Sequence, residues 1–509
     1  MLPKLATVVC MLFIFYLFWM DLRRPDDRSM ALWVPLAWMF LAGSRWVSSW
    51  LNLAPAFASA SDYAEGSPVD RAVFFALIVA GVLILARRKI DWERLLVRNK
   101  RLLIRNKWIV LYLLYCLASI AWTDEPLILT KRWVKDLGNP IMALVILTER
   151  RPYEAVGVVL RRLAFLLLPL SVLFIKYYPE LGRAYRADGS PMFVGVGHQK
   201  NDLGLMCLMA GIYLFWELFR RRKKTRPALT RQEKIVAVVL SGMLVWLLYM
   251  SDSQTSLVCL VTAALILLLG RTPFIARRPA RILAVLFCAV LAIWFLDEVL
   301  HVKELAFSFL GRNPTLTNRT EVWQTLKGFE VNPMVGAGFM SFWTGARLEN
   351  VWRLLGPGIN QAHNGYLEQY LNLGYIGVAF IAIIMLSGLL KVRKHLSVDP
   401  AAGTLRLCFI VTVALYNYTE ASFYGMNNMW MLLLLGCIEV PRQRQPRVVG
   451  KSQSNQRMVR SNADAEYQQW PPRVRAESSG TSKLRARTPT GPDVQGSPPA
   501  PRARRGLFT

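Results

Sequence analysis

Long apolar runs alternate with short basic runs along this chain, and no other feature limits its possible folds as strongly. A helix that crosses a bilayer core of about 30 Å needs roughly 20 mainly apolar residues. Such runs recur from residues 5–20 to residues 428–439, and 54% of the 509 residues are hydrophobic. The pattern predicts an all-α fold, a polytopic bundle of transmembrane helices.

Thirteen apolar segments are candidate spans, and a count of 12 also fits because several are short. They are residues 5–20, 30–43, 70–86, 108–122, 133–148, 163–178, 202–219, 235–250, 256–270, 282–296, 366–390, 407–420 and 428–439. With thirteen spans, the two termini lie on opposite sides of the membrane. The first segment resembles a signal peptide, but DLRRPDDR follows it in place of a small-residue cleavage site, so we interpret it as an uncleaved span.

The charge of each connecting segment predicts which side of the membrane it faces. Lys and Arg concentrate in short cytoplasmic loops, and four connections are strongly basic: residues 87–107, 220–234, 271–281 and 391–406. Three longer loops then face outward: residues 44–69, 179–201 and 297–363. We therefore expect residues 1–440 to form a transmembrane domain in which the large outward loop at 297–363 contains short helices and folds into a small cap.

The composition changes after residue 440. Residues 441–509 are rich in Arg, Pro, Ser, Gly and Gln, and they contain 14 basic and 4 acidic residues. This composition predicts a disordered basic tail, which lies in the cytoplasm if there are thirteen spans. The tail can either contact the anionic inner leaflet or stay solvated without a specific partner.

Side chains capable of chemistry gather in the outward loops. In the loop at 179–201, Arg183 and Arg186 precede a Gly-rich turn, and His198, Lys200 and Asn201 come just before the next span. Arg offers a planar bidentate fork to a phosphate and Lys offers a point charge. The same cations can instead pair with lipid headgroups at the interface, and this loop alone leaves both interpretations open.

The long outward loop contains a segment with helical periodicity. Its apolar residues recur at a spacing that predicts a short amphipathic helix at 320–330, with Thr320 as the N-cap and Arg319 at its beginning. Taken alone, Arg319 fits a solvated surface residue equally well. Gly336 and Gly338 form only a GxG, which predicts a plain turn and not a nucleotide site.

A histidine stands directly before an apolar helix at residues 361–380. His363 and Asn364 follow GPGIN, and Asn364 is a natural helix cap. The positive end of the helix dipole disfavours the imidazolium form of His363, and a neutral imidazole can accept a proton from a hydroxyl. A capping or interfacial histidine is the alternative explanation.

Two further patterns argue against other classes of protein. The seven cysteines show no CxxC and no clustering with histidine, so neither a disulfide framework nor a zinc site is indicated. The ionisable residues noted within or beside the spans, Lys176, Glu217 and Asp252, lie near span ends. This scarcity argues against a transporter of charged substrates.

Taken in order, four segments resemble a known family. They are H-x-K-N-x-L-G at 198–204, S-D-S-Q-T-S at 251–256, N-R-T-x-x-W at 318–323 followed by N-P-x-x-G-x-G, and H-N-x-Y-L-E at 363–368 followed by L-G-x-x-G. Together they resemble the O-antigen ligase and exopolysaccharide polymerase family of bacterial inner-membrane proteins. The resemblance covers roughly residues 100–440. Asn318 departs from the family pattern, which often has glycine there.

The resemblance implies an activity and a location. Members transfer or polymerise glycan units from an undecaprenyl diphosphate carrier onto an acceptor hydroxyl, of a glycan or of lipid A-core, at the periplasmic face of the inner membrane. It implies that His363, Arg319 and Arg186 are catalytic, with Arg183 as an alternative to Arg186. The H-x-K-N form favours the polymerase branch over the ligase branch.

These assignments imply a mechanism without a metal or other cofactor. Arg186, Arg319 and Lys200 would stabilise the leaving diphosphate while His363 activates the acceptor hydroxyl, which inverts the anomeric configuration. The expected substrate-binding residues are Arg183, His198, Lys200, Asn201, Asn364 and Trp323. Aromatic side chains of the outward loops can stack on sugar faces: Trp323, Phe342, Trp343 and Trp352.

The expected partners are the lipid-linked donor, the acceptor, membrane lipids and other polysaccharide assembly proteins, with no nucleic acid. Two alternatives remain from the sequence. One is an exporter of lipid-linked glycan, and the other is a non-catalytic subunit of a polysaccharide assembly complex.

Overall fold

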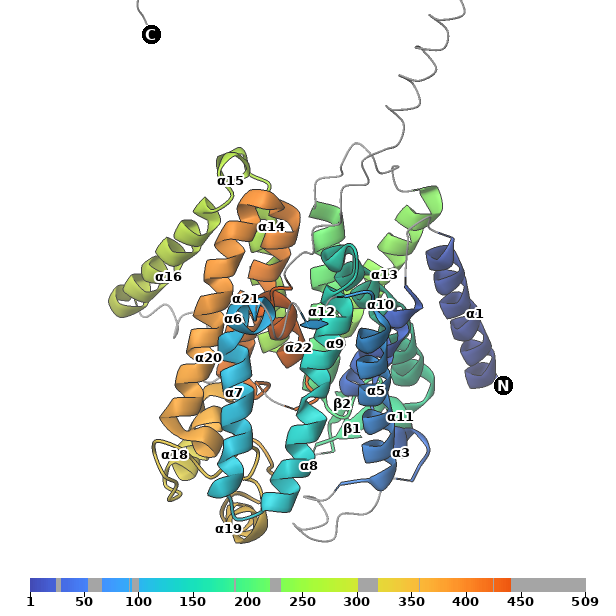
Figure 1. Ribbon diagram of the computed structural model, residues 1–509. Coiled ribbons are helices and arrows are strands. Elements are labelled where there is room, and N and C mark those ends of the chain that lie inside the picture. The colour runs from blue at the N-terminus through green and yellow to red at the C-terminus, as the bar shows by residue number, and fades with distance from the viewer. Residues whose placement is uncertain are drawn as a thin grey trace, which may run out of the picture. The chain divides into compact units, whose positions relative to one another are not determined.

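The structure is a computed structural model in which most of the described chain is helical (Figure 1). It describes residues 1–23, 29–53, 66–90, 92–93, 100–186, 189–219, 230–300, 319–356, 358–423 and 425–440. The predicted tail at 441–509 and Asn318 therefore lie outside the described residues. Of the long outward loop, the structure describes 297–300, 319–356 and 358–363.

The elements follow one another in this order. The first half contains α1 (Leu2–Leu22), η1 (Met30–Leu32), α2 (Trp33–Gly43), α3 (Val47–Trp50), α5 (Pro68–Arg87), α6 (Arg101–Arg105), α7 (Lys107–Ala118), η3 (Ser119–Ala121), α8 (Pro126–Asp136), α9 (Gly138–Leu147), α10 (Pro152–Tyr177), α11 (Pro179–Gly182), and the hairpin strands β1 (Arg183–Tyr185) and β2 (Pro191–Phe193). The second half contains α12 (Lys200–Phe219), α13 (Arg231–Ser251), α14 (Gln254–Leu269), α15 (Pro273–Arg277), α16 (Arg281–Leu300), α18 (Arg319–Lys327), α19 (Gly345–Leu355), α20 (Gly365–Val398), α21 (Pro400–Thr419) and α22 (Asn428–Cys437).

The helices confirm an all-α polytopic membrane protein. Seven helices of the described chain are long and apolar enough to cross a membrane: α1, α5, α10, α12, α13, α20 and α21. Each of the thirteen predicted spans overlaps a helix, because an apolar run long enough to cross a bilayer must satisfy its own backbone polar groups. The total number of crossings stays a prediction.

The interior of the bundle is built around α10, α12, α14, α21 and α22. Successive pairs of these helices pack together, and α20 packs along α21. The side chains of Trp38 and Trp430 are fully buried in this core. Helices α1, α5 and α13 bury much less of their length, so they form the outer part of the bundle.

A buried ion triad corrects the expectation that charged residues inside the helices are scarce. Helix α10 begins at Pro152, earlier than predicted, and so includes Arg161 and Arg162. The Asp21 carboxylate of α1 accepts a hydrogen bond from Arg161 and another, of 2.8 Å, from Arg162 Nε. All three side chains are buried. Because one carboxylate binds both guanidinium groups, the triad joins α1 to α10 and keeps one net positive charge.

Helix α20 is interrupted at Gly374, where φ is 63° and ψ is −165°. The loop at 333–338, which we call the seat loop, contacts this interruption through its backbone. Ala337 and Gly338 donate to the carbonyls of residues 371 and 372, and Tyr375 donates to that of Pro333 at 2.8 Å. The predicted GxG turn is therefore present, and it supplies hydrogen bonds that the interrupted helix lacks.

Residues 319–356 of the outward loop, which include the seat loop, form a small folded unit that we call the cap. Its two helices, α18 and α19, are brought together by a separate apolar cluster that includes Leu326, Phe342, Leu348 and Val351. Thr320 is the second residue of α18 and not its N-cap, and the helix ends at Lys327, before the predicted boundary.

Polar contacts attach the cap to the α7–α8 connection. Arg347 Nη2 donates to Asp124 Oδ2 at 2.9 Å, and Thr123 Oγ1 donates to Ser341 Oγ at 2.8 Å. Arg132 of α8 also donates to the carbonyl of Met340. The cap is thus held both by α20 and by the α7–α8 region, which fixes its position over the end of the bundle that carries His363.

Candidate functional site

His363 lies at the junction between the outward loop and α20. Asn364 is the N-cap of α20, as predicted, and its Oδ1 accepts hydrogen bonds of 3.0 Å from the backbone N–H groups of Tyr366 and Leu367. His363 itself has a φ of 48°, in the left-handed region that non-glycine residues seldom adopt. A backbone in this conformation persists only where its surroundings hold it.

Two side chains supply that constraint by holding the peptide groups of Ala362. Glu368 Oε2 accepts the Ala362 N–H at 2.8 Å, and Trp323 Nε1 donates to the Ala362 carbonyl at 2.8 Å. Glu368 is fully buried and also accepts hydrogen bonds from the Trp343 indole and from Asn372. The residue before His363 is therefore fixed from α18 on one side and from α20 on the other.

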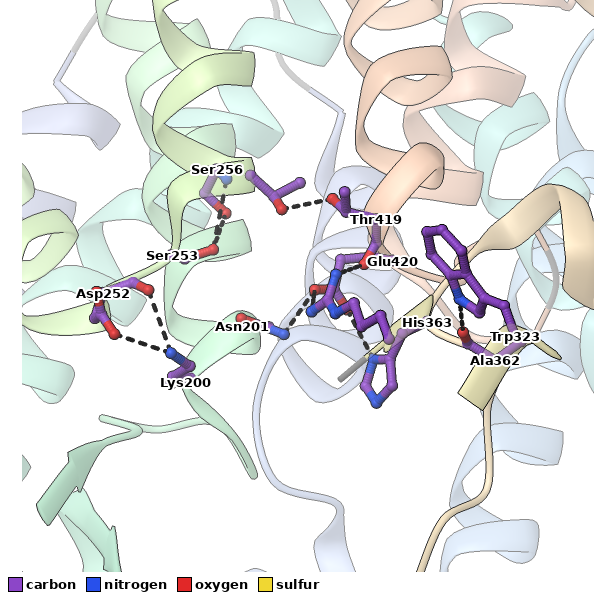
Figure 2. Close-up of polar contacts among 12 residues, drawn as sticks. Lys200, Asn201, Asp252, Ser253, Ser256, Trp323, Ala362, His363, Thr419 and Glu420 are labelled. Atoms are coloured by element: carbon purple, nitrogen blue, oxygen red, sulfur yellow. Dashed lines mark hydrogen bonds and ion pairs between the residues drawn. The ribbon is translucent and has the colours of Figure 1, made fainter. Parts of the chain in front are cut away.

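A buried carboxylate, Glu420, joins the residues singled out in the sequence (Figure 2). His363 Nδ1 lies 3.3 Å from Glu420 Oε2, and Arg319 Nη2 and Asn201 Nδ2 donate to Oε1 at 2.8 and 2.7 Å. Arg319 also donates to the Thr419 carbonyl. The side chain of Glu420 is only 7% exposed, whereas that of His363 is 33% exposed. Four segments distant in the sequence thus meet at one acidic group.

Sequence reasoning missed Glu420. It was assigned to the end of the span at 407–420, but α21 ends at Thr419 and Glu420 is its extended C-cap. A signal was available, since a carboxylate at the end of an apolar helix is costly unless it is paired. Its backbone is also engaged, because the Gly365 N–H donates to the Glu420 carbonyl at 2.9 Å.

The contact with Glu420 determines what His363 can do chemically. A carboxylate beside Nδ1 favours the tautomer that carries its proton on Nδ1, which leaves Nε2 with a free lone pair. In Figure 2 the second ring nitrogen points away from Glu420. Because the imidazole keeps a third of its surface exposed, Nε2 is suited to accept a proton from a bound hydroxyl.

A second polar group, beside the first, contains two of the predicted phosphate-binding cations. Lys200 Nζ donates to Asp252 Oδ2 at 3.0 Å, and Arg186 Nη2 lies 3.7 Å from the same oxygen. Asp252 belongs to the S-D-S-Q-T-S segment between α13 and α14. The exposed fractions of the Lys200, Arg186 and Asp252 side chains are 25%, 43% and 45%. An incoming anion can therefore reach both cations.

Hydrogen bonds connect the two polar groups. Lys200 and Asn201 are adjacent at the start of α12, and one contacts Asp252 while the other contacts Glu420. Thr255, also in the S-D-S-Q-T-S segment, lies 2.6 Å from Thr419 through the two hydroxyl oxygens. Polar contacts therefore connect residues from all four segments that carry the resemblance.

Arg183 and His198 do not join this network. Arg183 donates from Nε and Nη2 to the Ile175 carbonyl, at 3.2 and 2.9 Å, so it ties the β1–β2 hairpin to α10. His198 packs edge-on against Trp46, with ring centroids 6.1 Å apart. Partial burial is the largest cause that lowers the pKa of His198; Asp202 opposes this shift, and Arg45 adds to it.

The four aromatic residues predicted to stack on sugars differ in where they lie. Phe342 and Trp343 are buried in the cap cluster, so their interior positions contradict a stacking role. Trp352 is partly buried and donates to the Ile359 carbonyl at 2.9 Å. Trp323 remains beside the candidate site and packs edge-on against Tyr418, with centroids 6.5 Å apart.

Among the described residues, no group of three or more His, Cys, Asp or Glu side chains is placed to hold a metal ion. The charged groups in the site instead form two acid-centred networks, one on Glu420 and one on Asp252. The first can hold and orient a proton acceptor, and the second displays cations.

Two comparisons with known proteins bear on this arrangement. Residues 236–382 match the family described as O-Antigen ligase. The chain is also 24% identical, over 355 residues, to the exopolysaccharide production protein ExoQ of Rhizobium meliloti (strain 1021), an alignment that covers 66% of this chain and 78% of that protein. Both matches agree with the resemblance seen in the motifs to the O-antigen ligase and exopolysaccharide polymerase family.

Proposed function

We propose that this protein is a membrane glycosyltransferase of O-antigen or exopolysaccharide biosynthesis. It transfers glycan units from an undecaprenyl diphosphate carrier to an acceptor hydroxyl at the periplasmic face of the bacterial inner membrane. The observation that carries the proposal is the meeting of His363, Arg319 and Asn201 at the buried Glu420. The similarity to an exopolysaccharide production protein favours exopolysaccharide as the product, and the H-x-K-N form at 198–201 favours chain growth over final ligation.

The proposed reaction is a single displacement. The acceptor hydroxyl oxygen attacks the anomeric carbon of the donor and forms the new glycosidic bond. The bond from that carbon to the diphosphate oxygen breaks, and its electron pair leaves with the diphosphate. The hydroxyl proton passes to Nε2 of His363, and Glu420 stabilises the resulting imidazolium. One displacement inverts the anomeric configuration.

The cations have two separate parts in this proposal. Lys200 and Arg186 exchange Asp252 for the donor diphosphate and stabilise its growing negative charge, without a metal. Arg319 is bound by Glu420 and the Thr419 carbonyl, so it mainly holds Glu420 in position and adds positive charge near the reacting groups.

The test is the length profile of carrier-linked glycan in cells whose only copy of the protein carries His363→Ala. Accumulated single repeat units indicate a polymerase, and long chains retained on the carrier indicate a ligase. The matched control is His395→Ala, near the other end of the same helix. Both variants are first shown to reach the membrane at normal levels. An unchanged profile in His363→Ala contradicts the catalytic role and favours a non-catalytic subunit.

A further inference from the structure

A groove of about 500 Å³ lies between α5 and α8, and none of its lining residues belongs to the two acid-centred networks. Its walls combine apolar side chains, such as Phe75 and Val134, with three basic ones, Arg71, Lys131 and Lys135. Such a mixture is unusual on the side of the membrane that we predict to be outward, because basic residues concentrate on the cytoplasmic side.

The positive charge of the groove is only partly neutralised locally. Lys131 and Lys135 are four residues apart on α8 and so share one face of the helix. Two acids adjoin these residues in the sequence, Asp70 and Asp136; both are buried, and Asp70 accepts the Ser48 N–H at 2.9 Å. No side-chain hydrogen bond or ion pair joins Arg71 or Lys131 to another described residue. Arg71 and Lys131 therefore lack a counter-ion among the described residues, whereas Lys135 interacts with Asp70 and Asp136 and has its Nζ 5.2 Å from the centroid of the Trp46 ring.

The apolar wall of the groove continues towards the membrane. Phe75 is 58% exposed, and Val79 and Val82 follow it on the same face of α5 and are also exposed. Helix α5 is one of the helices long and apolar enough to cross a bilayer. Leu127 of α8, 77% exposed, lies on the opposite wall. An apolar strip thus leads from the cations along a membrane-crossing helix.

We propose that this groove binds one anionic phospholipid. Its phosphate lies between Arg71 and Lys131, and an acyl chain follows the strip that starts at Phe75. The charge pattern selects this occupant, because an amphiphile with an anionic head and an apolar chain matches both parts of the groove at once. The aliphatic stems of Arg71 and Lys131 line the apolar interior while their charged ends remain at its rim. The site does not depend on the proposed transferase activity.

The test is native mass spectrometry of the purified full chain with defined lipids. The probes are phosphatidylglycerol, phosphatidylcholine and a polyprenyl diphosphate, each presented at equal concentration. The variant is Arg71→Gln with Lys131→Gln, and the matched control is Lys327→Gln with Arg353→Gln, two exposed cations of the cap. A cation near a lipid phosphate changes affinity about fivefold. The groove variant should therefore lose phosphatidylglycerol retention roughly 25-fold, while the control stays within about twofold.

A second variant keeps the charge constant. Val134→Trp fills the groove and should also abolish selective retention of phosphatidylglycerol, which separates binding in the groove from a general loss of positive charge. Equal retention of phosphatidylcholine by the wild type overturns the proposal. So does an equal loss in the control variant. Preferential, groove-dependent retention of the polyprenyl diphosphate also overturns it, and would assign the groove to the glycan donor.

Discussion

Replacing Glu420 with glutamine is the sharpest test of the proposed site, because it changes charge and hydrogen bonding while keeping size. One oxygen of Glu420 accepts from both Arg319 and Asn201, and the other faces His363. A glutamine has one acceptor oxygen and one NH2 group in the same space. Arg319 and Asn201 are both donors, so the glutamine oxygen stays towards them and its NH2 group turns towards His363.

That arrangement removes the proton acceptor. With an NH2 group beside it, His363 Nδ1 must accept a hydrogen bond, so the ring proton moves to Nε2 and the imidazole can no longer take a proton there. General base catalysis contributes about 10²- to 10⁴-fold to a rate. We therefore expect kcat to fall at least 100-fold, about 2.7 kcal/mol in activation free energy. The donor KM should change less than about threefold, because Lys200 and Arg186 are untouched.

The assay is glycan transfer from a polyprenyl-diphosphate donor by the full chain in liposomes. The matched control is Glu330→Gln, an exposed carboxylate of the cap, which should retain the wild-type rate. A Glu420→Gln protein that reaches the membrane, keeps its thermal stability and retains kcat within about threefold of wild type would refute the assigned role of Glu420. A large increase in donor KM with unchanged kcat would contradict it as well.

Three further predictions concern the framework around the site. Asp21→Ala leaves two buried guanidinium groups without their carboxylate and should cost about 3–5 kcal/mol, seen as a lower thermal unfolding midpoint, whereas Glu154→Ala at an exposed ion pair should cost less than about 1 kcal/mol. Gly374→Ala places a Cβ 2.2 Å from a carbonyl carbon of the seat loop, so the loop must move and limited proteolysis should cleave the cap faster. The control is Gly242→Ala, where an added Cβ meets no atom within 4 Å. Equal cleavage rates in the two variants would contradict the role of the seat loop in holding the cap on α20. Glu368→Gln replaces one acceptor oxygen by an NH2 group, and an unsatisfied buried donor costs roughly 1–3 kcal/mol. Because this weakens the hold on Ala362 beside His363, the transfer rate should fall about tenfold. A wild-type rate would show that the hydrogen bond from Ala362 to Glu368 is not needed for transfer.

The helices could be predicted from the sequence more fully than their ends. Apolar runs locate each helix because a bilayer requires them, and the Asn364 cap follows from a local hydrogen-bonding rule. Helix α10 was placed too late because Arg161 and Arg162 look like a cytoplasmic connection until Asp21 is seen beside them. The sequence around Arg161 does not show that this residue is buried, because its partner Asp21 lies 140 residues away.

The candidate site could be predicted as a set of residues but not as a network. His363, Arg319 and Asn201 were identified through the motifs, yet only tertiary packing brings them to Glu420. The sequence also could not separate Arg183 from Arg186. Their difference arises from the hairpin, in which Arg183 turns back to a carbonyl of α10 while Arg186, beyond the strand, reaches Asp252. Spacing alone does not contain that information.

The seat loop also determines how tolerant the cap is to sequence divergence. Its contact with α20 is made by backbone hydrogen bonds, and Gly336 and Gly374 allow these two segments of the chain to approach closely. Backbone hydrogen bonds do not depend on side-chain identity, so this contact tolerates most substitutions outside its glycines. The side-chain contacts from the cap to Asp124 and Glu368 are the positions at which a substitution would weaken its attachment.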